Sequence, residues 1–341
     1  MIREVSYVVL SFAIVLLAVV AYLVRPSVLH EAVSRMRARF VAGLPLGTLV
    51  IIVVNVVFFL FAQRAYTGDV LTVPYLSWSY TYPTGFLTGP IGHANLSHIV
   101  GNLTAAVVFA PVVEYTVGHK VDVSGEPSRR PLLRALVGVP LLWYSVGVFL
   151  SLFSWGPSIG FSGVVYFFFG FVIVFYPVVS VGLIVVIDAF RTLFNALRSP
   201  VTTSSPGEAF FTPSWANIAL DGHVLGLLVG AGVAILLARR RGRRIDGYRV
   251  GAAVFVIGLA QGLYAVWTLD GSTYVLYRAV GVAFVGFLAV LLGYAAEVES
   301  SSRPFFELNT FTPRRAVSVS AVVVPVVVLC VVGFVRGLGT V

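Results

Sequence analysis

A serine between two glycines is the first residue in this chain whose position suggests chemistry. The tetrapeptide Gly160-Phe161-Ser162-Gly163 opens an apolar run that is long enough to enter a membrane. Small residues line helix contacts in membranes because they let backbones approach, so a serine there can be a packing residue. A hydroxyl at such a position can also act as a nucleophile when a base lies beside it. The other polar residues of the chain indicate which of these interpretations applies.

Further polar side chains stand at the start of two other apolar segments. The sequence HANLSHIVGN supplies His93, His98 and Asn102, and DGHVLGLLVG supplies His223. Polar groups inside a membrane are costly, face the protein interior and mark functional sites. His98 and Asn102 are four residues apart and share a helix face, whereas His93 and His98 are five apart, a poor spacing for one metal. Because the chain also lacks His-Glu-x-x-His, we expect neither a metal nor a cofactor.

The composition is that of an integral membrane protein. Of the 341 residues, 58% are hydrophobic and 11% are charged, and the mean hydropathy is +0.96, which excludes an ordinary soluble domain. Cys330 is the single cysteine, so a disulfide framework is excluded. The net charge of +9 could attract nucleic acid, but basic residues of polytopic proteins collect in cytoplasmic loops. We therefore expect no nucleic-acid partner.

Ten apolar segments have about the length that a membrane-spanning helix needs. Only Tyr176-Pro177 separates the fifth from the sixth, and proline favours a break there because it cannot continue the helical hydrogen bonds. Long outer loops follow the second and sixth segments, at 63–92 and 199–214. The segments are 5–24, 44–62, 96–116, 132–153, 160–176, 178–197, 215–238, 250–268, 275–296 and 316–336.

The distribution of basic residues predicts an orientation in the membrane. If the first segment runs inward, most of the 23 Lys and Arg residues lie in inner loops, as the positive-inside rule requires. Both ends of the chain then lie outside, and we expect the protein in the cell membrane. The basic residues left outside are Arg3, Arg64, Arg191, Arg198, Arg278 and Arg336.

Under this orientation the third, fifth and seventh segments all run from outside inward. In each of them the polar residues lie within roughly the first two turns of the expected helix. Ser162, His223, His98 and Asn102 are therefore expected at one level below the outer surface. Packing alone does not explain four polar groups at one depth.

Glycines allow the helices that carry these residues to touch. Gly226 and Gly230 form Gly-x-x-x-Gly on the seventh segment, and Gly163 and Gly170 lie on the fifth. Two helix backbones can approach closely at such positions. The serine of the fifth segment and the histidine of the seventh are therefore expected to hydrogen-bond.

At these residues the sequence resembles the rhomboid intramembrane serine proteases. The resemblance covers residues 44–237, a six-helix core, and says nothing about the other segments. Two features depart from the family: Trp78 is followed by Ser79 where many members have Trp-Arg, and Gly222 stands where alanine is usual. The first departure leaves the anchoring of the first outer loop open. The matching residues are His93, His98, Asn102, Glu114, Gly118, Gly160, Ser162, Gly163, Tyr166, His223, Gly226 and Gly230.

The expected fold is an all-α polytopic membrane protein. The resemblance implies a six-helix rhomboid-like core, to which the segment count adds about four transmembrane helices, one N-terminal and three C-terminal. The expected divisions are an N-terminal helix and inner loop at 1–43, a catalytic core at 44–238 and a C-terminal extension at 239–341. The oligomeric state stays open.

The expected chemistry is that of a serine–histidine dyad. We interpret Ser162 as the nucleophile and His223 as the general base, without an obligatory carboxylate. Asp221 lies two residues before the histidine and therefore points to another side of the helix.

The resemblance also implies a set of supporting groups. Tyr166 would stack on the catalytic histidine and fix its ring. His98 and Asn102, with the backbone N–H of Ser162, would bind the oxyanion. We expect His93 to be a structural hydrogen bonder at the mouth of the loop.

These roles predict an intramembrane serine endopeptidase that cuts transmembrane segments of other proteins near their outer ends. Membrane protein substrates and the lipid bilayer are the expected partners. The loop at 199–214 and the sixth segment are candidates for the gate. The alternative is a catalytically silent rhomboid-like protein that binds and escorts membrane proteins. A transporter is disfavoured because the sequence shows neither an acidic series nor repeated broken helices.

Overall fold

The computed structural model describes residues 26–120, 130–153, 157–184, 187–188, 220–270 and 273–297. The expected segments at 5–24 and 316–336 lie outside these residues, as do the loop at 199–214 and most of the segment at 178–197. The total of ten spanning segments and the division into three domains therefore stay predictions.

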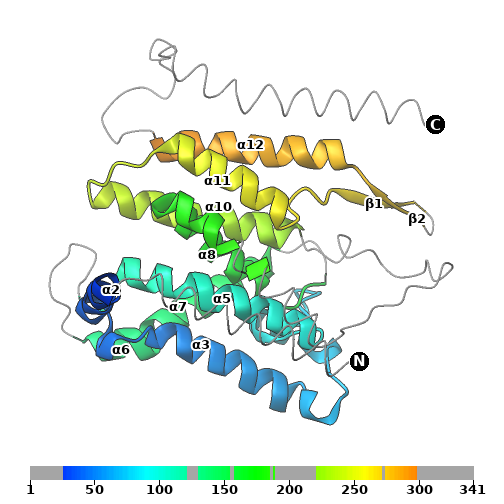
Figure 1. Cartoon of the computed structure of the whole chain (residues 1–341). Helices are drawn as coiled ribbons and strands as arrows, with labels where there is room; N and C mark the ends of the chain where they lie inside the picture. Colours follow the sequence, from blue (N-terminus) through cyan, green and yellow to red (C-terminus); the bar gives the residue numbers. More distant parts are fainter. Residues whose placement is uncertain are drawn as a thin grey trace, which may run out of the picture.

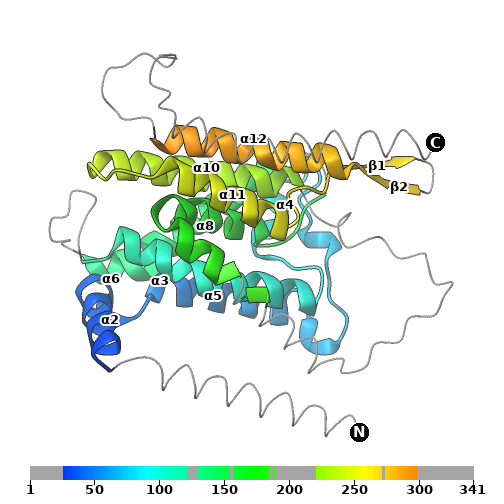
Figure 2. The ribbon, with the colours of Figure 1, turned by 45° about the horizontal axis from the view of Figure 1, so that its top comes forward.

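The regular secondary structure of the described residues is helical apart from one small hairpin (Figure 1) and one isolated bridge. Helix α8 lies between α5 and α10 in both views of the ribbon (Figures 1 and 2), and α11 and α12 pack against each other beside α10. The elements in chain order are α2 (Pro26–Arg39), η1 (Val41–Gly43), α3 (Leu46–Val57), η2 (Phe58–Ala62), η3 (Ala65–Thr67), η4 (Val73–Tyr75), α4 (Pro83–Thr88), η5 (Gly89–Ile91), α5 (Leu96–Val117), α6 (Pro131–Leu133), η6 (Arg134–Gly138), α7 (Val139–Leu152), α8 (Ser162–Phe175), α10 (Leu220–Arg240), α11 (Gly247–Ala260), β1 (Trp267–Asp270), β2 (Thr273–Leu276) and α12 (Arg278–Glu297).

Four of the described helices are long and apolar enough to cross a membrane, as expected for a multi-pass membrane protein. They agree with the segments expected at 96–116, 132–153, 215–238 and 275–296. Three further helices, α3 with η2, α8 and α11, are apolar but shorter. The four long helices are Leu96–Val117, Pro131–Leu152, Leu220–Arg240 and Arg278–Glu297.

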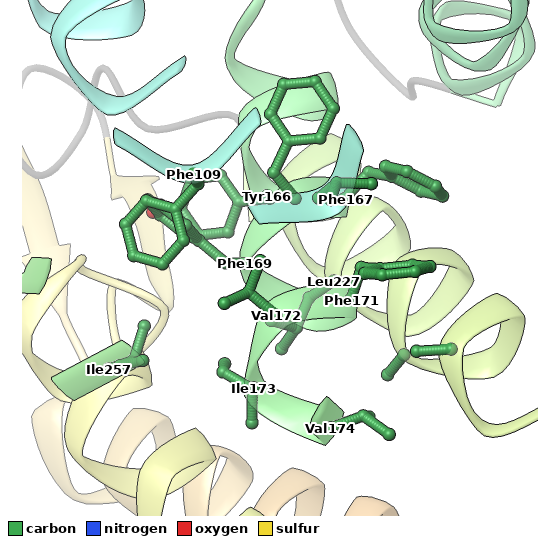
Figure 3. Packing of buried hydrophobic residues seen from close by; sticks show 14 of the residues in the cluster. Phe109, Tyr166, Phe167, Phe169, Phe171, Val172, Ile173, Val174, Leu227 and Ile257 are labelled. Atoms are coloured by element: carbon green, nitrogen blue, oxygen red, sulfur yellow. The ribbon is translucent and has the colours of Figure 1, made fainter. Parts of the chain in front are cut away.

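Helix α8 is the centre of the packing. Its 14 residues extend over roughly 21 Å, less than the ~30 Å of a bilayer core. The helix is apolar on every side and residues 164–175 are all buried, as expected for a helix surrounded by others. Figure 3 shows Phe169 of this helix beside Phe109 of α5, with ring centroids 4.6 Å apart, and Phe167 of α8 and Leu227 of α10 belong to the same buried core. Because α8 is too short to span a bilayer, at least one of its ends lies inside it.

Glycines bring α8 and α10 into backbone contact. A Cβ atom on Gly226 would lie 2.3 Å from the carbonyl oxygen of Gly163. A Cβ atom on Gly230 would lie 2.0 Å from the carbonyl oxygen of Phe167. Real Cβ atoms do not approach an oxygen this closely, so only glycine fits at either position. The predicted close approach of these two helices is confirmed.

Gly170→Ala is expected to destabilise the protein through the same contact. Its Cβ would lie 2.0 Å from the carbonyl oxygen of Leu227, so the two backbones must separate, which typically costs about 1–3 kcal/mol. Thermal unfolding in detergent should therefore show a lower midpoint. Gly232→Ala is the matched control, because nothing lies within 4 Å of a Cβ at that helical position. Equal midpoints for the two variants would contradict this account of the packing.

A buried carboxylate joins the C-terminal end of α5 to the start of α3. Glu114 accepts hydrogen bonds from the backbone N–H groups of Gly47 and Thr48, each at 2.8 Å, and it pairs with His119. The first N–H groups of a helix have no partner within the helix and favour negative charge. This contact gives Glu114 and His119 a structural role. The sequence alone assigns no role to His119.

Two expected segment boundaries have different outcomes. The break before Pro177 is confirmed, because Tyr176 has the non-helical angles φ −141° and ψ 58° and residues 177–184 are helical again. The helix expected at 250–268 is wrong at its end. Helix α11 stops at Ala260, and Gly262 follows with φ 78°, a conformation that favours glycine and ends helices.

The residues beyond α11 form a hairpin instead of a continued helix. Strand β1 pairs with β2 in antiparallel register, with Trp267 opposite Leu276 and Asp270 opposite Thr273. The expectation of an entirely α-helical fold is therefore wrong at this place. The dipeptide Asp270-Gly271 between β-forming residues is a hairpin signal that the hydropathy pattern obscured.

Candidate active site

Ser162 and His223 come from different helices and lie within hydrogen-bond distance. Ser162 is the first residue of α8, and His223 is in the first turn of α10. The distance between Ser162 Oγ and His223 Nε2 is 2.8 Å. The glycine contacts between the two helices explain how these side chains can meet. A hydroxyl paired with an imidazole is the arrangement that nucleophilic catalysis needs.

Tyr166 covers one face of the histidine. The two ring centroids are 4.2 Å apart and the ring planes differ by 9°. Tyr166 lies one turn after Ser162 on α8, and its hydroxyl donates to the main-chain oxygen of Gln261. The second histidine nitrogen, Nδ1 of His223, is buried and has no hydrogen-bond partner among the described residues. Asp221 therefore does not hydrogen-bond to it.

A small cavity borders the serine and the histidine. Its volume of about 50 Å³ leaves room for water. The walls come from η5, α7 and the segments at the starts of α8 and α10, and they include Gly89, Gly147 and Gly160. Water can therefore lie beside the hydroxyl of Ser162.

His98 and Asn102 face the chain just before the serine, at Gly160. Gly160 has φ +133°, and a Cβ there would lie 2.8 Å from His98 Nε2 and 3.5 Å from Asn102 Nδ2. Glycine is therefore required both for the backbone angle and for the space. Asn102 Nδ2 is buried without a hydrogen-bond partner in the described part of the chain. A buried donor left free in this way is available to a ligand.

The hydrogen bonding of His98 decides which of its nitrogens carries the proton. The backbone N–H of Ala94 donates to Nδ1 at 3.3 Å. Nδ1 is then the acceptor, and Nε2 carries the proton in the neutral ring. Nε2 is also the atom that lies next to Gly160. His98 and Asn102 thus both present N–H donors to the backbone beside Ser162.

His93 lies fully buried beside His98. The ring centroids of the two histidines are 5.2 Å apart at an angle of 71°. Burial and the neighbouring His98 lower the pKa of His93 to about 3, so its ring is neutral near pH 7. No group of three His, Cys, Asp or Glu that could hold a metal occurs among the residues that the structure describes.

Gln63, which the sequence analysis did not single out, holds the loop that carries His93. Its side-chain oxygen accepts from the N–H of His93 at 2.7 Å, and its side-chain nitrogen donates to the carbonyl of His93 at 2.8 Å. The same nitrogen donates to the carbonyl of Leu71 at 2.9 Å. One buried amide therefore joins the end of η2, the first outer loop and the entrance to α5.

The segment before Ser162 is tied to the first outer loop by main-chain hydrogen bonds. Ser77 and Ser158 form an isolated antiparallel bridge, with N–H to carbonyl distances of 3.0 and 2.9 Å. The N–H of Gly160 donates to the carbonyl of Gly89 at 2.9 Å. These bonds anchor the loop that lacks the Trp-Arg pair. Their residues carry no sequence signal, because any residue has a backbone N–H and carbonyl.

Comparison with protein families matches residues 81–240 to the rhomboid domain. The matched stretch contains His93, His98, Asn102, Ser162, Tyr166 and His223, and it ends with α10. Helices α11 and α12 and the hairpin between them lie beyond it. No curated protein and no solved structure matches the chain.

Proposed function

We propose that this chain, whose residues 81–240 match the rhomboid domain, is an intramembrane serine endopeptidase. Ser162 is the nucleophile and His223 is the general base. The observation that carries the proposal is the 2.8 Å contact between Ser162 Oγ and His223 Nε2, which borders a cavity with room for water.

In the proposed reaction the imidazole of His223 transfers one proton during acylation of the serine and one during hydrolysis of the acyl-enzyme. His223 Nε2 takes the proton of the Ser162 hydroxyl as Oγ attacks the carbonyl carbon of the scissile peptide bond. The tetrahedral intermediate collapses, and Nε2 gives this proton to the leaving nitrogen. Water from the cavity then loses a proton to Nε2 and attacks the acyl-enzyme. When the second tetrahedral intermediate collapses, Nε2 returns this proton to Oγ as the new carboxyl end leaves.

His98 and Asn102 are proposed to stabilise the negative oxygen of each tetrahedral intermediate. Their N–H donors converge on Gly160, two residues before the helix that begins with the nucleophile. The first N–H groups of α8 have no partner within the helix and favour negative charge. Donors already in place when charge develops lower the barrier without further reorganisation.

The active site is proposed to open to the outer side of the membrane. Arg39 and Arg241 donate to the carbonyl of Thr116 at 3.4 and 2.7 Å, at the C-terminal end of α5. His98 and Asn102 lie at the opposite end of this 22-residue helix. Basic residues favour the cytoplasmic side, so the end with the dyad faces outward.

The proposed substrates are transmembrane segments of other proteins, cut near their outer ends. A helical segment has to unwind before its backbone can lie across Ser162, so segments with glycine or proline should be preferred because they unwind at least cost. The expected gate consists of the loop at 199–214, which lies outside the described residues, and the sixth segment, of which most lies outside them.

The test is labelling with a serine-directed fluorophosphonate, followed by identification of the modified residue by mass spectrometry. Purified protein should carry the label on Ser162 and should cleave a single-span test substrate in proteoliposomes. Ser151→Ala is the matched control, because the Ser151 hydroxyl lines the same cavity but donates to the carbonyls of Phe86 and Val148. This variant should label and cleave like the unmodified protein.

The same experiment separates the enzyme from its alternative. A folded protein that neither labels nor cleaves, but that retains a transmembrane segment on co-purification, would be the catalytically silent relative. Label on Ser151 in place of Ser162 would contradict the assignment of the nucleophile.

A further inference from the structure

Tyr166 connects the catalytic histidine to a part of the chain outside the rhomboid domain. Its ring stacks on His223, and its hydroxyl donates to the main-chain oxygen of Gln261. Gln261 follows α11 and lies beyond residue 240, where the family match ends. The side chain of Tyr166 is buried, so its hydroxyl would lose free energy without an acceptor.

The acceptor exists because α11 ends where it does. Gln261 is the C-terminal cap of α11, with φ −101° and ψ 17°, and Gly262 turns the chain with φ 78°. The last carbonyls of a helix have no partner within the helix. If the helix continued, the carbonyl of Gln261 would bond the N–H four residues further on. The glycine therefore leaves this carbonyl free to accept from Tyr166.

Packing of the extension fixes the position of this carbonyl. Ile257 of α11 and Ile173 of α8, both labelled in Figure 3, belong to the same buried core, and the two helices are in contact. The turn after α11 rests on the start of α12, where a Cβ on Gly281 would lie 1.7 Å from the carbonyl oxygen of Tyr264. Gln261 thus lies in the chain between Ile257, which packs in the core, and Tyr264, which rests on α12.

The imidazole of His223 has few other restraints on its orientation. Nε2 bonds Ser162, whereas Nδ1 has no hydrogen-bond partner among the described residues. Among the described residues, therefore, no hydrogen bond to a carboxylate or carbonyl sets the rotation of the ring from that side, as a third catalytic residue would. Stacking against the ring of Tyr166 restricts the rotation of the imidazole instead.

We propose that the C-terminal extension is a working part of the catalytic site, in which the Gln261 carbonyl holds the Tyr166 ring and thereby orients His223. Tyr166 and Gln261 are positioning residues, since neither touches the reacting atoms. The inference rests on the proposed protease function. It gives α11 and α12 a role that the family resemblance does not supply.

A double-mutant cycle tests the proposal with Tyr166→Phe and Gly281→Ala. The first variant keeps the ring and removes the hydroxyl, and the second displaces the turn after α11. Each alone should lower kcat about 3- to 10-fold, the value of one hydrogen bond, with KM unchanged. Because both break the same bond, the double variant should be no slower than the slower single variant. Fluorophosphonate labelling rates should follow the same pattern.

Gly232→Ala is the control for a helical glycine, since its Cβ meets nothing within 4 Å, and it should leave kcat unchanged. Gly258→Ala, whose Cβ would lie 2.7 Å from Val285 Cγ1 between α11 and α12, replaces Gly281→Ala if that variant does not fold. Two outcomes in an active enzyme would overturn this inference and leave the proposed function intact. In one, the losses of kcat in the two single variants multiply in the double variant; in the other, Tyr166→Phe keeps the full kcat. An inactive unmodified protein would overturn the proposed function and this inference with it.

Discussion

Ser162→Ala is expected to reduce cleavage of a transmembrane substrate by about 10⁴-fold or more. The Ser162 hydroxyl is the group proposed to form the acyl-enzyme, and alanine has no atom that could replace it. The variant should fold normally, because Ser162 is the first residue of α8 and alanine is a good helix former. Cleavage is measured by product formation in proteoliposomes, with folding checked by thermal unfolding.

His223→Ala should cause a loss of similar size, and the double variant should be no worse than either single variant. Residues that act as a unit in catalysis are grossly non-additive, because removal of either one disables the same step. Ser151→Ala, with its hydroxyl in the same cavity, should retain full activity. Cleavage that persists in both Ser162→Ala and His223→Ala would rule out the dyad.

The parts of this site that the sequence predicts are those that depend on local spacing. His98 and Asn102 share a helix face because they are four residues apart, and the structure places both beside Gly160. Gly226 and Gly230 predict a close helix contact because only glycine permits one, and the contact is present. Such inferences need only helix geometry and the small volume of glycine, so a single sequence suffices for them.

The parts that the sequence could not predict depend on main-chain atoms and on distant contacts. The carbonyl of Gln261 accepts from a hydroxyl 95 residues earlier, and a carbonyl is common to every residue. The bonds of Gln63 to His93 and of Ser77 to Ser158 are of the same kind. They depend on where two loops meet, which hydropathy and spacing do not determine.

The end of α11 was predictable in principle but was hidden by hydropathy. The residues after Ala260 remain apolar, so a helix through residue 268 satisfied the pattern. Gly262 and the Asp270-Gly271 pair were the contrary signals, and local turn chemistry prevailed over the length of the apolar run. This boundary matters because it creates the carbonyl to which Tyr166 donates.

Asn102→Ala is expected to lower kcat by on the order of 100- to 1000-fold with little change in KM. Asn102 Nδ2 is buried beside Gly160 without a partner in the described part of the chain. Leaving a buried donor unsatisfied costs about 1–3 kcal/mol. That cost is recovered when an oxyanion forms next to the serine, so the bond is worth most in the transition state. A group of this kind changes kcat more than substrate binding.

A measurement of stability distinguishes the proposed oxyanion role of Asn102 from a structural role. Truncation of Asn102, whose Nδ2 donates to no described residue, should cost little stability. Asn55→Ala, in contrast, removes a buried amide that donates to the carbonyl of Ile51 at 2.8 Å. We therefore expect Asn55→Ala to lower the unfolding midpoint and spare kcat, and Asn102→Ala to do the reverse. Steady-state kinetics and thermal unfolding of both variants measure this. An Asn102→Ala enzyme with unchanged kcat would remove the asparagine from the oxyanion site and leave His98 and the first amides of α8 as its donors.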